Sequence, residues 1–317
     1  MEVKRITPIP LTNDEGKKYA VSAAESELKK KATEVKYLGG GSFGKAFKVT
    51  FEDNTKAVIK FLRAKDMLKK EAYDLKLLGE STPVKMPKVL FVREADDKIP
   101  VDCYGMEMLE GRNACMDVSF FLTSRKKRME FAENVTSALH SIHSHKSDRF
   151  GDTINPVYET WIDCYKPFAE AVLREAKALY NKGELSGKIM DTMNAAWEKF
   201  DVIFSEPVTE ACLIHGDLNI ANIMIDKKGN LAGFIDPLNS MYADREYDLF
   251  QFYNLTGKHF FLGETYRKKY GESRHCDDKL AFYGLWNEVF CLIKSGVLVG
   301  FIMNPLVKNM NRRLKNL

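Results

Sequence analysis

Residues 213–236, which read LIHGDLNIANIMIDKKGNLAGFID, constrain the fold more than any other part of the chain. Two short apolar runs, rich in β-branched residues, flank turn-forming residues at 226–230. This pattern predicts a β-hairpin. Polar residues capable of chemistry stand at both ends of the predicted hairpin, so its pairing decides which of them meet.

A hairpin that folds symmetrically about this turn pairs residue 223 with residue 235 and places Asn222 opposite Asp236. Directly opposed residues of an antiparallel pair have Cα atoms only about 4.5–5.5 Å apart. The side-chain oxygens of Asn222 and Asp236 can then meet at one Mg²⁺, which prefers hard oxygen ligands. Asp217 lies five residues before Asn222, close enough to orient a nucleophile beside that ion.

A second informative region begins at Tyr37 and reads YLGGGSFGKAFKVTFEDNTKAVIKFL. Its G-x-G-x-x-G pattern also occurs in dinucleotide-binding folds, where a helix follows the glycines and an acid for the ribose lies about twenty residues on. Here a strand, a turn and a second strand follow, and Lys60 stands in place of the acid. The glycines are therefore expected at a hairpin tip, where backbone N–H groups can approach phosphate oxygens. The loop residues expected to bind nucleotide are Gly39, Gly41, Ser42, Phe43 and Gly44.

Lys60 lies in Ala57-Val-Ile-Lys60, which is close to the V-A-I-K element that neutralises α- and β-phosphates. The next segment, residues 66–80, has apolar residues at helical spacing and Gly79 as a plausible stop. Glu71 on this helix is the best candidate to hold Lys60 in place by an ion pair. Glu80 is the weaker candidate, and a solvent-facing helix surface is the alternative reading of Glu71.

Together these segments resemble the aminoglycoside phosphotransferase and choline kinase family of small-molecule kinases, which has a protein-kinase-like fold. The resemblance covers about residue 35 to at least residue 260. It rests on the glycine loop, Lys60, Glu71, His215-Gly-Asp-Leu-Asn-Ile-Ala-Asn222, Phe234-Ile-Asp236 and Asp244-Arg-Glu-Tyr-Asp-Leu249. The H-G-D-x-x-x-x-N element is the specific part of this set.

The resemblance implies roles for individual residues. Asp217 would be the catalytic acid/base, and Asn222 and Asp236 would be the Mg²⁺ ligands. Lys60 would contact the phosphates of ATP. Asp248 would support the catalytic loop from a helix, and His215 would shape that loop by hydrogen bonding.

Two departures from the protein-kinase pattern argue against a protein substrate. Gly216 and Asn219 stand where protein kinases carry Arg and Lys around the catalytic Asp, and Asp236 is followed by Pro237 rather than by F-G. The I-D-P element with Tyr242–Leu249 looks most like the fructosamine kinase branch. That branch usually has Trp where this chain has Asn219, and its glycine loop is usually less like that of protein kinases, so the branch stays open.

The pattern predicts an α+β fold with two lobes. A small antiparallel β-lobe would span residues 1–108 and a larger, mainly helical lobe residues 109–317, with the catalytic loop in the second. The adenine of ATP would contact the hinge between Glu107 and Leu109. Long helices are expected at 126–143, 167–180 and 187–204.

Composition excludes several other classes of protein. The net charge of +4 comes without a Lys/Arg tail, so no nucleic-acid partner is expected. The six cysteines are scattered and form no C-x-x-C pair, which is typical of a cytoplasmic protein with reduced thiols. The apolar segment 285–303 contains charged residues and predicts one buried helix rather than a membrane span.

The expected activity is Mg²⁺-dependent transfer of the ATP γ-phosphoryl group to a hydroxyl of a small molecule. The expected acceptor is an amino sugar, an aminoglycoside, a ketosamine or an amino alcohol, and so a compound that can carry an amine. A protein serine/threonine kinase and a nucleotide-binding regulator without activity are the alternatives.

Overall fold

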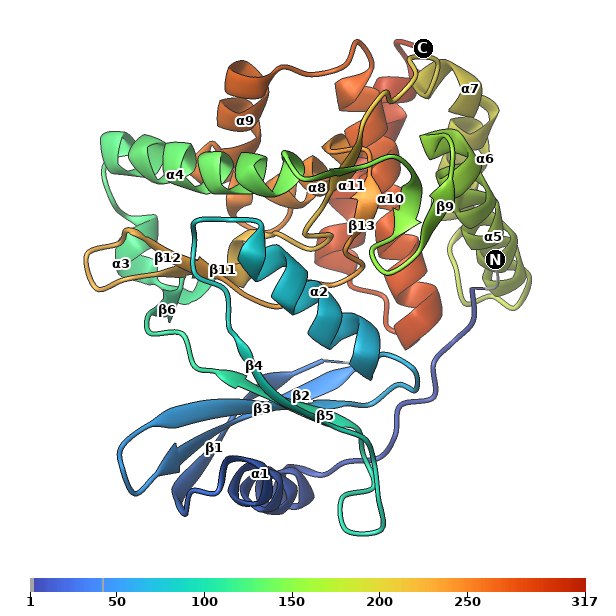
Figure 1. Ribbon diagram of the computed structural model, residues 1–317. Coiled ribbons are helices and arrows are strands. Elements are labelled where there is room, and N and C mark those ends of the chain that lie inside the picture. Colours follow the sequence, from blue (N-terminus) through green and yellow to red (C-terminus); the bar gives the residue numbers. More distant parts are fainter. Residues whose placement is uncertain (1–2, 42) are drawn as a thin grey trace.

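The computed structural model describes residues 3–41 and 43–317. A smaller lobe built on a β-sheet lies against a larger lobe dominated by helices (Figure 1). Ser42, one of the expected nucleotide-binding residues, lies outside the described residues.

The smaller lobe contains an antiparallel five-stranded sheet in the order β1-β2-β3-β5-β4. The bounds are β1 Ala32–Gly40, β2 Gly44–Phe51, β3 Lys56–Leu62, β4 Val89–Arg93 and β5 Cys103–Glu107. In β2, Phe47, Val49 and Phe51 are buried and alternate with less buried residues. This alternation is expected of a strand with one face in a core. The expected strand–turn–strand after the glycine loop is confirmed.

Two helices cover opposite faces of this sheet (Figure 1). Helix α1 (Asn13–Leu28) begins with a capping box formed by Thr12 and Glu15. Its Gly16 allows a close approach to the sheet, because a Cβ there would lie 2.3 Å from the ring of Phe47. Helix α2 (Leu68–Glu80) lies between the sheet and the larger lobe.

Helix α2 confirms the helix expected at 66–80, although Gly79 lies inside it rather than ending it. The buried residues Leu68, Leu75 and Leu78 belong to the core cluster that continues into the larger lobe. The residues between the sheet and α1 form a separate cluster that includes Phe47 and Val49. Helix α2 is therefore packed as part of the interface between the lobes.

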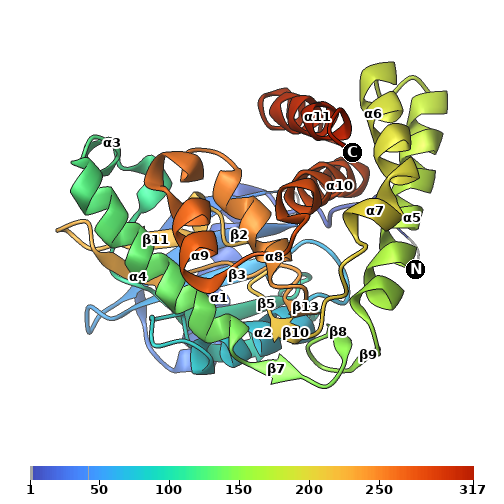
Figure 2. The same ribbon diagram turned by 90° about the horizontal axis from the view of Figure 1, so that it is seen from above.

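Helices make up most of the larger lobe, and Figure 2 shows α5, α6, α10 and α11 gathered at one end of it. The α-helices here are α3 Val118–Phe121, α4 Arg125–His143, α5 Trp161–Asn181, α6 Gly187–Glu198, α7 Phe200–Ile203, α8 Glu246–Leu249, α9 Leu262–Tyr270, α10 Cys276–Ser295 and α11 Gly300–Leu314. The 3₁₀ turns are η1 Ala114–Met116, η2 Ile220–Asn222, η3 Phe250–Tyr253 and η4 Gly257–Phe260.

The helix expected at 126–143 is confirmed, and the other expected boundaries need correction. Helix α5 begins at Trp161, where Thr160 caps it, and Pro167 lies inside it. The segment 187–204 is two helices, because the chain leaves helical geometry at Lys199. This break turns Phe200 and Phe204 toward Phe282 of α10, with ring centroids 5.5 and 5.3 Å away.

The single helix expected over 285–303 is wrong. Helix α10 ends at Ser295, and Gly296 follows with a φ of +72°. The Gly296 N–H donates to the carbonyl of Leu292 at 2.7 Å, which closes the helix, and α11 begins at Gly300. Glycine takes this left-handed conformation readily, so it ends the helix inside an apolar run. No helix among the described residues is long and apolar enough to cross a membrane.

Two small antiparallel sheets position the segment that contains Asp217. One has the order β7-β10-β13-β8-β9 and the other the order β12-β11-β6. Their bounds are β6 Arg112–Asn113, β7 Lys146–Ser147, β8 Phe150–Asp152, β9 Pro156–Tyr158, β10 Ala211–Leu213, β11 Ile223–Ile225, β12 Leu231–Phe234 and β13 Met241–Ala243. The segment 214–222 runs from β10 to β11 and so connects the two sheets.

The N-terminal segment, residues 3–11, joins the lobes a second time, in addition to the link at 108–111. Val3 is buried in the larger core, and the Ile6 N–H donates to the carbonyl of Lys294 at 3.0 Å. Three residues later, the Ile9 N–H donates to the carbonyl of Arg63 at 2.8 Å in the smaller lobe. Pro8 and Pro10 on either side of Ile9 favour an extended chain. We call residues 3–11 the N-terminal strap.

Candidate active site

A cavity of about 510 Å³ lies between the glycine loop and the β11–β12 hairpin. Its lining includes every described residue for which nucleotide contact was expected. These residues are Gly39, Gly41, Phe43, Gly44, Lys60, Glu71, Glu107 and Leu109, and Asp236 joins them from the other side. Two segments that are distant in the sequence thus share one cleft.

Lys60 forms the expected ion pair with Glu71. Its Nζ also lies 2.5 Å from Oδ1 of Asp236, and the Tyr104 hydroxyl donates to Oε1 of Glu71 at 3.2 Å. Burial alone would lower the pKa of Lys60, but the negative charges around it outweigh burial and raise this pKa well above its ordinary value. The lysine therefore stays charged at the position where a phosphate would bind.

Asp248 fixes the start of the catalytic loop. Its carboxylate accepts the main-chain N–H groups of His215 and Gly216, each at 2.7 Å. The imidazole of His143 lies 3.1 Å from the same carboxylate and 2.6 Å from the Tyr266 hydroxyl. These contacts agree with the structural role that the resemblance implied for Asp248.

Gly216 occupies a place where no side chain fits. Its φ is +82°, and a Cβ there would lie 2.2 Å from the carbonyl oxygen of Leu238. Real Cβ atoms are not found this close to a backbone oxygen. An arginine, the residue that protein kinases carry here, would require a different path for residues 238–239.

Asp217 is held by two amide side chains. Nδ2 of Asn219 donates to its Oδ1, and Nδ2 of Asn222 to its Oδ2, each at 3.0 Å. Burial, together with the nearby charge of Asp236, raises the pKa of Asp217 to about 7, although both amides act to lower it. A carboxylate with a pKa near neutrality is suited to accept a proton from a hydroxyl.

The expected hairpin register is wrong by one residue. Ile223 pairs with Phe234 rather than with residue 235, and the Ile235 N–H donates to the carbonyl of Asn222 at 3.0 Å. The turn closes with Ile225 opposite Leu231, which without a bulge would pair Ile223 with Gly233. A bulge places one extra residue on β12, so Met224 pairs with Gly233 and the partner of Ile223 moves to Phe234, one residue short of the expected partner. Asn222 therefore opposes Ile235, and Asp236 follows one residue later with a left-handed φ of +56°.

The chemistry of these donors fits the expected divalent cation. The Asn222 amide nitrogen faces Asp217, and its side-chain oxygen accepts no hydrogen bond from any described residue. The Asp236 side chain is 52% exposed beside the cavity and binds only through one oxygen, to Lys60. Both side chains therefore offer oxygen atoms with available lone pairs. Mg²⁺ commonly takes one or two such protein ligands, and phosphates and water complete its coordination shell.

Asn219 is a site residue that the sequence interpretation missed. It was noted only as a departure from family patterns. Its Oδ1 accepts the Ala221 N–H at 2.9 Å and caps η2, which leaves Nδ2 to contact Asp217. An Asn at the start of a short turn, two residues after Asp217, is the signal that could have predicted this contact.

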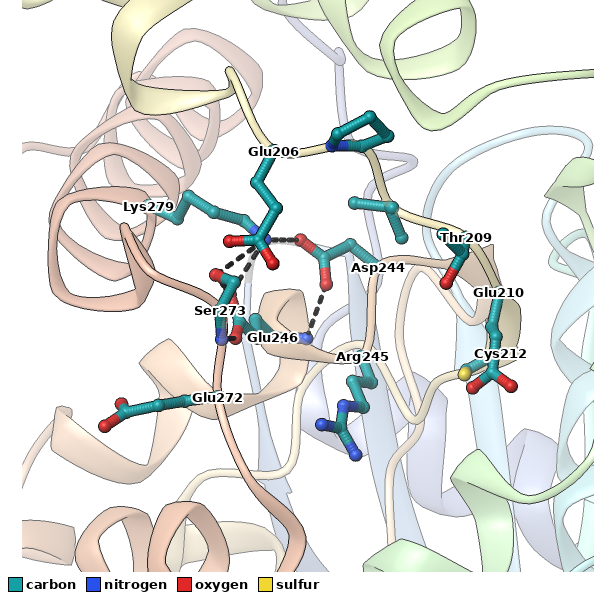
Figure 3. Close-up of a pocket in the computed structure, with 12 residues that line it drawn as sticks. Glu206, Thr209, Glu210, Cys212, Asp244, Arg245, Glu246, Glu272, Ser273 and Lys279 are labelled. Carbon is teal, nitrogen blue, oxygen red and sulfur yellow. Dashed lines mark hydrogen bonds and ion pairs between the residues drawn. The ribbon is translucent and has the colours of Figure 1, made fainter.

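A second, smaller cavity of about 240 Å³ lies beside β10 and the start of α10 (Figure 3). Figure 3 shows the Lys279 ammonium between Asp244 and Glu246, at 2.5 and 2.7 Å. Ser273 also donates to Glu246, from its N–H at 2.6 Å and its hydroxyl at 2.7 Å. One ammonium is shared by two carboxylates, and the neutral donors of Ser273 add to the contacts of Glu246, so this group serves to anchor α10 beside α8. It accounts for the two acidic residues at the start of the Asp244–Leu249 motif.

The model of the fructosamine kinase family matches residues 17–292 of the chain. Curated protein sequences yield no match. The fold of the chain is also similar to that of solved structures.

Three solved structures illustrate this similarity. A protein from Thermobifida fusca YX-ER1 assigned as a fructosamine-3-kinase is 18% identical, with a TM-score of 0.64 over 92% of this chain and 98% of its own. The GDP complex of aminoglycoside 2'-phosphotransferase-IIIa is 16% identical, with a TM-score of 0.67 over 95% and 99%. The gentamicin complex of APH(2")-IIa is 14% identical, with a TM-score of 0.66 over 96% and 97%. These likenesses confirm the two-lobed, protein-kinase-like α+β fold.

Proposed function

The chain belongs to the fructosamine kinase family of small-molecule kinases, and from this premise we propose that it transfers the γ-phosphoryl group of ATP to a hydroxyl of an amine-bearing small molecule. Ketosamines and amino sugars are the first acceptors to consider, followed by aminoglycosides and amino alcohols. Mg²⁺ is proposed as the accompanying ion. We also propose that the smaller lobe ends at residue 108 and that the larger lobe begins at residue 109.

The observation that carries this proposal is the setting of Asp217. Its carboxylate is held by Asn219 and Asn222, and its pKa is raised to about 7. A hydroxyl placed against this carboxylate would be oriented toward the γ-phosphorus. Positioning of this kind can supply a large part of the rate of a phosphoryl transfer, which needs little covalent participation by the protein.

The remaining residues would bind the nucleotide. Lys60, held by Glu71, would neutralise phosphate charge, and the glycine loop would cover the phosphates. Asn222 and Asp236 would hold Mg²⁺, which when bound offsets the negative charge of the β- and γ-phosphates. Lys60 can contact phosphate while keeping Glu71 as its second partner, because an ammonium group has three donors.

In the proposed transfer, the acceptor oxygen forms a bond to the γ-phosphorus as the bond from this phosphorus to the β,γ-bridging oxygen breaks. The hydroxyl proton passes to Asp217 late in the step, and ADP leaves. Asp217 afterwards releases the proton to water. No oxidant or covalent enzyme intermediate is required.

A carboxylate on α10, that of Glu288, is our reason to propose that the acceptor carries an amine. Glu288 is half-buried and has no hydrogen bond or ion pair with any described residue. It lies three residues before Cys291, on the same helix face. Burial first, and then the charges of both Glu288 and Asp217, raise the pKa of the Cys291 thiol to about 12. The charges of Glu288 and Asp217 thus both act on one thiol, and we infer that an ammonium group bound near Asp217 would be the partner that Glu288 lacks.

The relatives offer consistent chemistry. One similar structure is a complex with GDP and another a complex with gentamicin, so proteins of this fold hold a nucleotide and an amine-bearing compound. ATP is our proposal for the nucleotide, and GTP is the alternative. A cytoplasmic location is also proposed, which the six unpaired cysteines support.

The test is a screen for ADP release with ATP and Mg²⁺ across ketosamines, amino sugars, aminoglycosides and choline, repeated with GTP. Asp217→Asn serves as the blank. We expect turnover with at least one acceptor of this set and a rate lower by about 10²–10⁴-fold in the blank. Phosphate incorporation into mixed proteins, without turnover of small molecules, would instead support a protein kinase. Nucleotide binding without any turnover would support a regulator.

A further inference from the structure

Helix α2 carries a second set of polar contacts, made by Lys70, one residue before Glu71, and by Asp74, about one helical turn after it. Lys70 forms an ion pair with Asp74 and also donates to Oγ1 of Thr153 and to the carbonyl oxygen of Ser240, both at 2.8 Å. Thr153 in turn donates to Asp74. All these partners except Asp74 belong to the larger lobe. We call Lys70, Asp74, Thr153 and Ser240 the α2 clamp.

The α2 clamp continues into the catalytic loop. The Ser240 hydroxyl donates to the carbonyl oxygen of His215 at 2.9 Å, and His215 precedes Asp217 by two residues. Ser240 is 1% exposed, and Asp74 and Thr153 are each 4% exposed. A short chain of hydrogen bonds therefore leads from α2 to the residue next to Gly216.

The burial of Asp74 indicates that these contacts have a specific purpose. Asp74 lies three residues after Glu71, so both carboxylates occupy the buried face of one helix. A buried carboxylate is unfavourable unless it is paired, and removing one partner leaves an uncompensated charge. The N-terminus of α2 has no side-chain cap that could fix the helix instead. The position of α2 thus depends on the α2 clamp and on its apolar face.

The α2 clamp attaches helix α2 to the segment that follows Asp236. In protein kinases, phosphorylation of the segment after the metal-binding Asp controls whether the Lys–Glu ion pair forms. Here only residues 237–240 separate Asp236 from β13, and Lys70 binds the last of them. The segment that acts as a switch elsewhere is a fixed attachment for α2 in this chain.

We propose that Lys70 and Asp74 are positioning residues that hold α2 against the catalytic segment and keep Glu71 permanently on Lys60. The enzyme would then be competent to bind nucleotide without a prior modification. This inference rests on the proposed function, since it concerns how the same site is assembled. It adds a coupling between α2 and the catalytic loop that the site residues alone do not provide.

The test compares binding of Mg-ATP by calorimetry in four proteins: wild type, Lys70→Met, Glu71→Gln and the double variant. This readout needs no acceptor. We expect Lys70→Met to weaken binding about tenfold, and to weaken it less than about twofold when Glu71 is already replaced, because residues acting through one another are not additive. Lys70→Arg should restore most of the affinity. Lys69→Met is the matched control, since Lys69 is 82% exposed on the same helix.

Equal losses from Lys70→Met in both backgrounds would overturn the inference, and so would no loss in either. Thr153→Val provides a second variant if Lys70→Met does not fold, with the same expectation. Failure of wild-type protein to bind Mg-nucleotide at all would instead contradict the proposed function. The two failures are therefore distinguishable.

Discussion

Asn219 donates a side-chain hydrogen bond to the carboxylate of Asp217, with Nδ2 3.0 Å from Oδ1. A donor to the charged form of a carboxylate lowers its pKa. The pKa of Asp217 is nevertheless raised to about 7 by burial and by the charge of Asp236. The hydrogen bond from Asn219 thus limits how far the pKa of Asp217, the proposed base, is raised.

Asn219→Ala should move the pH dependence of activity. A base must be deprotonated, so wild-type kcat/KM should fall as the pH drops through about 7. Loss of the amide raises the pKa of Asp217, so the acidic limb of the profile should move to higher pH. The measurement is kcat/KM between pH 5.5 and 9 for both proteins. An unchanged acidic limb would show that Asn219 does not tune the base.

Asp217→Asn should lower kcat by about 10²–10⁴-fold, the usual contribution of a general base. The Kd for Mg-ATP should stay within about twofold, because Asp217 does not line the cavity proposed for the nucleotide. ADP release gives the first quantity and calorimetry the second. Asp201→Asn, whose side chain is 87% exposed, is the surface control. Near wild-type turnover in Asp217→Asn would contradict the assignment of the base.

Asp236→Ala should weaken Mg-ATP binding by tenfold or more, since a hard oxygen ligand is lost. The binding of ATP measured without Mg²⁺ should change much less. Calorimetry with the ion and with a chelator separates the two cases. Equal loss in both conditions would assign Asp236 to the nucleotide or to Lys60 rather than to the metal.

Gly216→Ala should destabilise the protein more than Gly183→Ala. Both glycines have a left-handed φ, +82° and +74°, but only at Gly216 would a Cβ meet a backbone oxygen. The conformation itself costs about 1 kcal/mol for alanine, and the clash adds to it. Thermal unfolding of the two variants isolates the steric part. Equal midpoints would mean that residues 238–239 move away easily.

Glu288→Gln should raise the KM for an amine-bearing acceptor roughly tenfold, as expected for loss of a charged contact worth ~1.4 kcal/mol. The KM for ATP and for an acceptor without an amine should not change. Glu170→Gln is the control, because Glu170 is exposed on α5. A similar rise for charged and neutral acceptors would remove the argument for amine recognition.

The local features of the site could be predicted from the sequence. The glycine loop at a hairpin tip, the Lys60–Glu71 pair and the order Asp217, Asn222, Asp236 depend on short patterns and on helix or strand spacing. The hairpin register could not be predicted, because the turn closes symmetrically and the bulge at Ala232 follows it. Nothing in an apolar run indicates which strand carries an extra residue.

Contacts between distant segments were the other part that the sequence could not supply. Lys70 lies 83 residues from Thr153 and 170 from Ser240. Nothing in the sequence around Asp74 marks this carboxylate as buried, yet it is buried against Thr153. The break at Lys199 likewise depends on aromatic packing against α10. Such features follow from the folded arrangement rather than from any local pattern.

The N-terminal strap has a mechanical consequence. Its hydrogen bonds at Ile6 and Ile9 tie the lobes together with only two residues between them, so this crossing can span no more than about 10 Å even when fully extended. Residues 108–111 form the other crossing. Two backbone crossings restrict sliding and twisting of the lobes, and the α2 clamp, which lies away from both, also restricts rotation about the line that joins them. Nucleotide entry and product exit in this protein should therefore proceed with only small displacements of one lobe against the other.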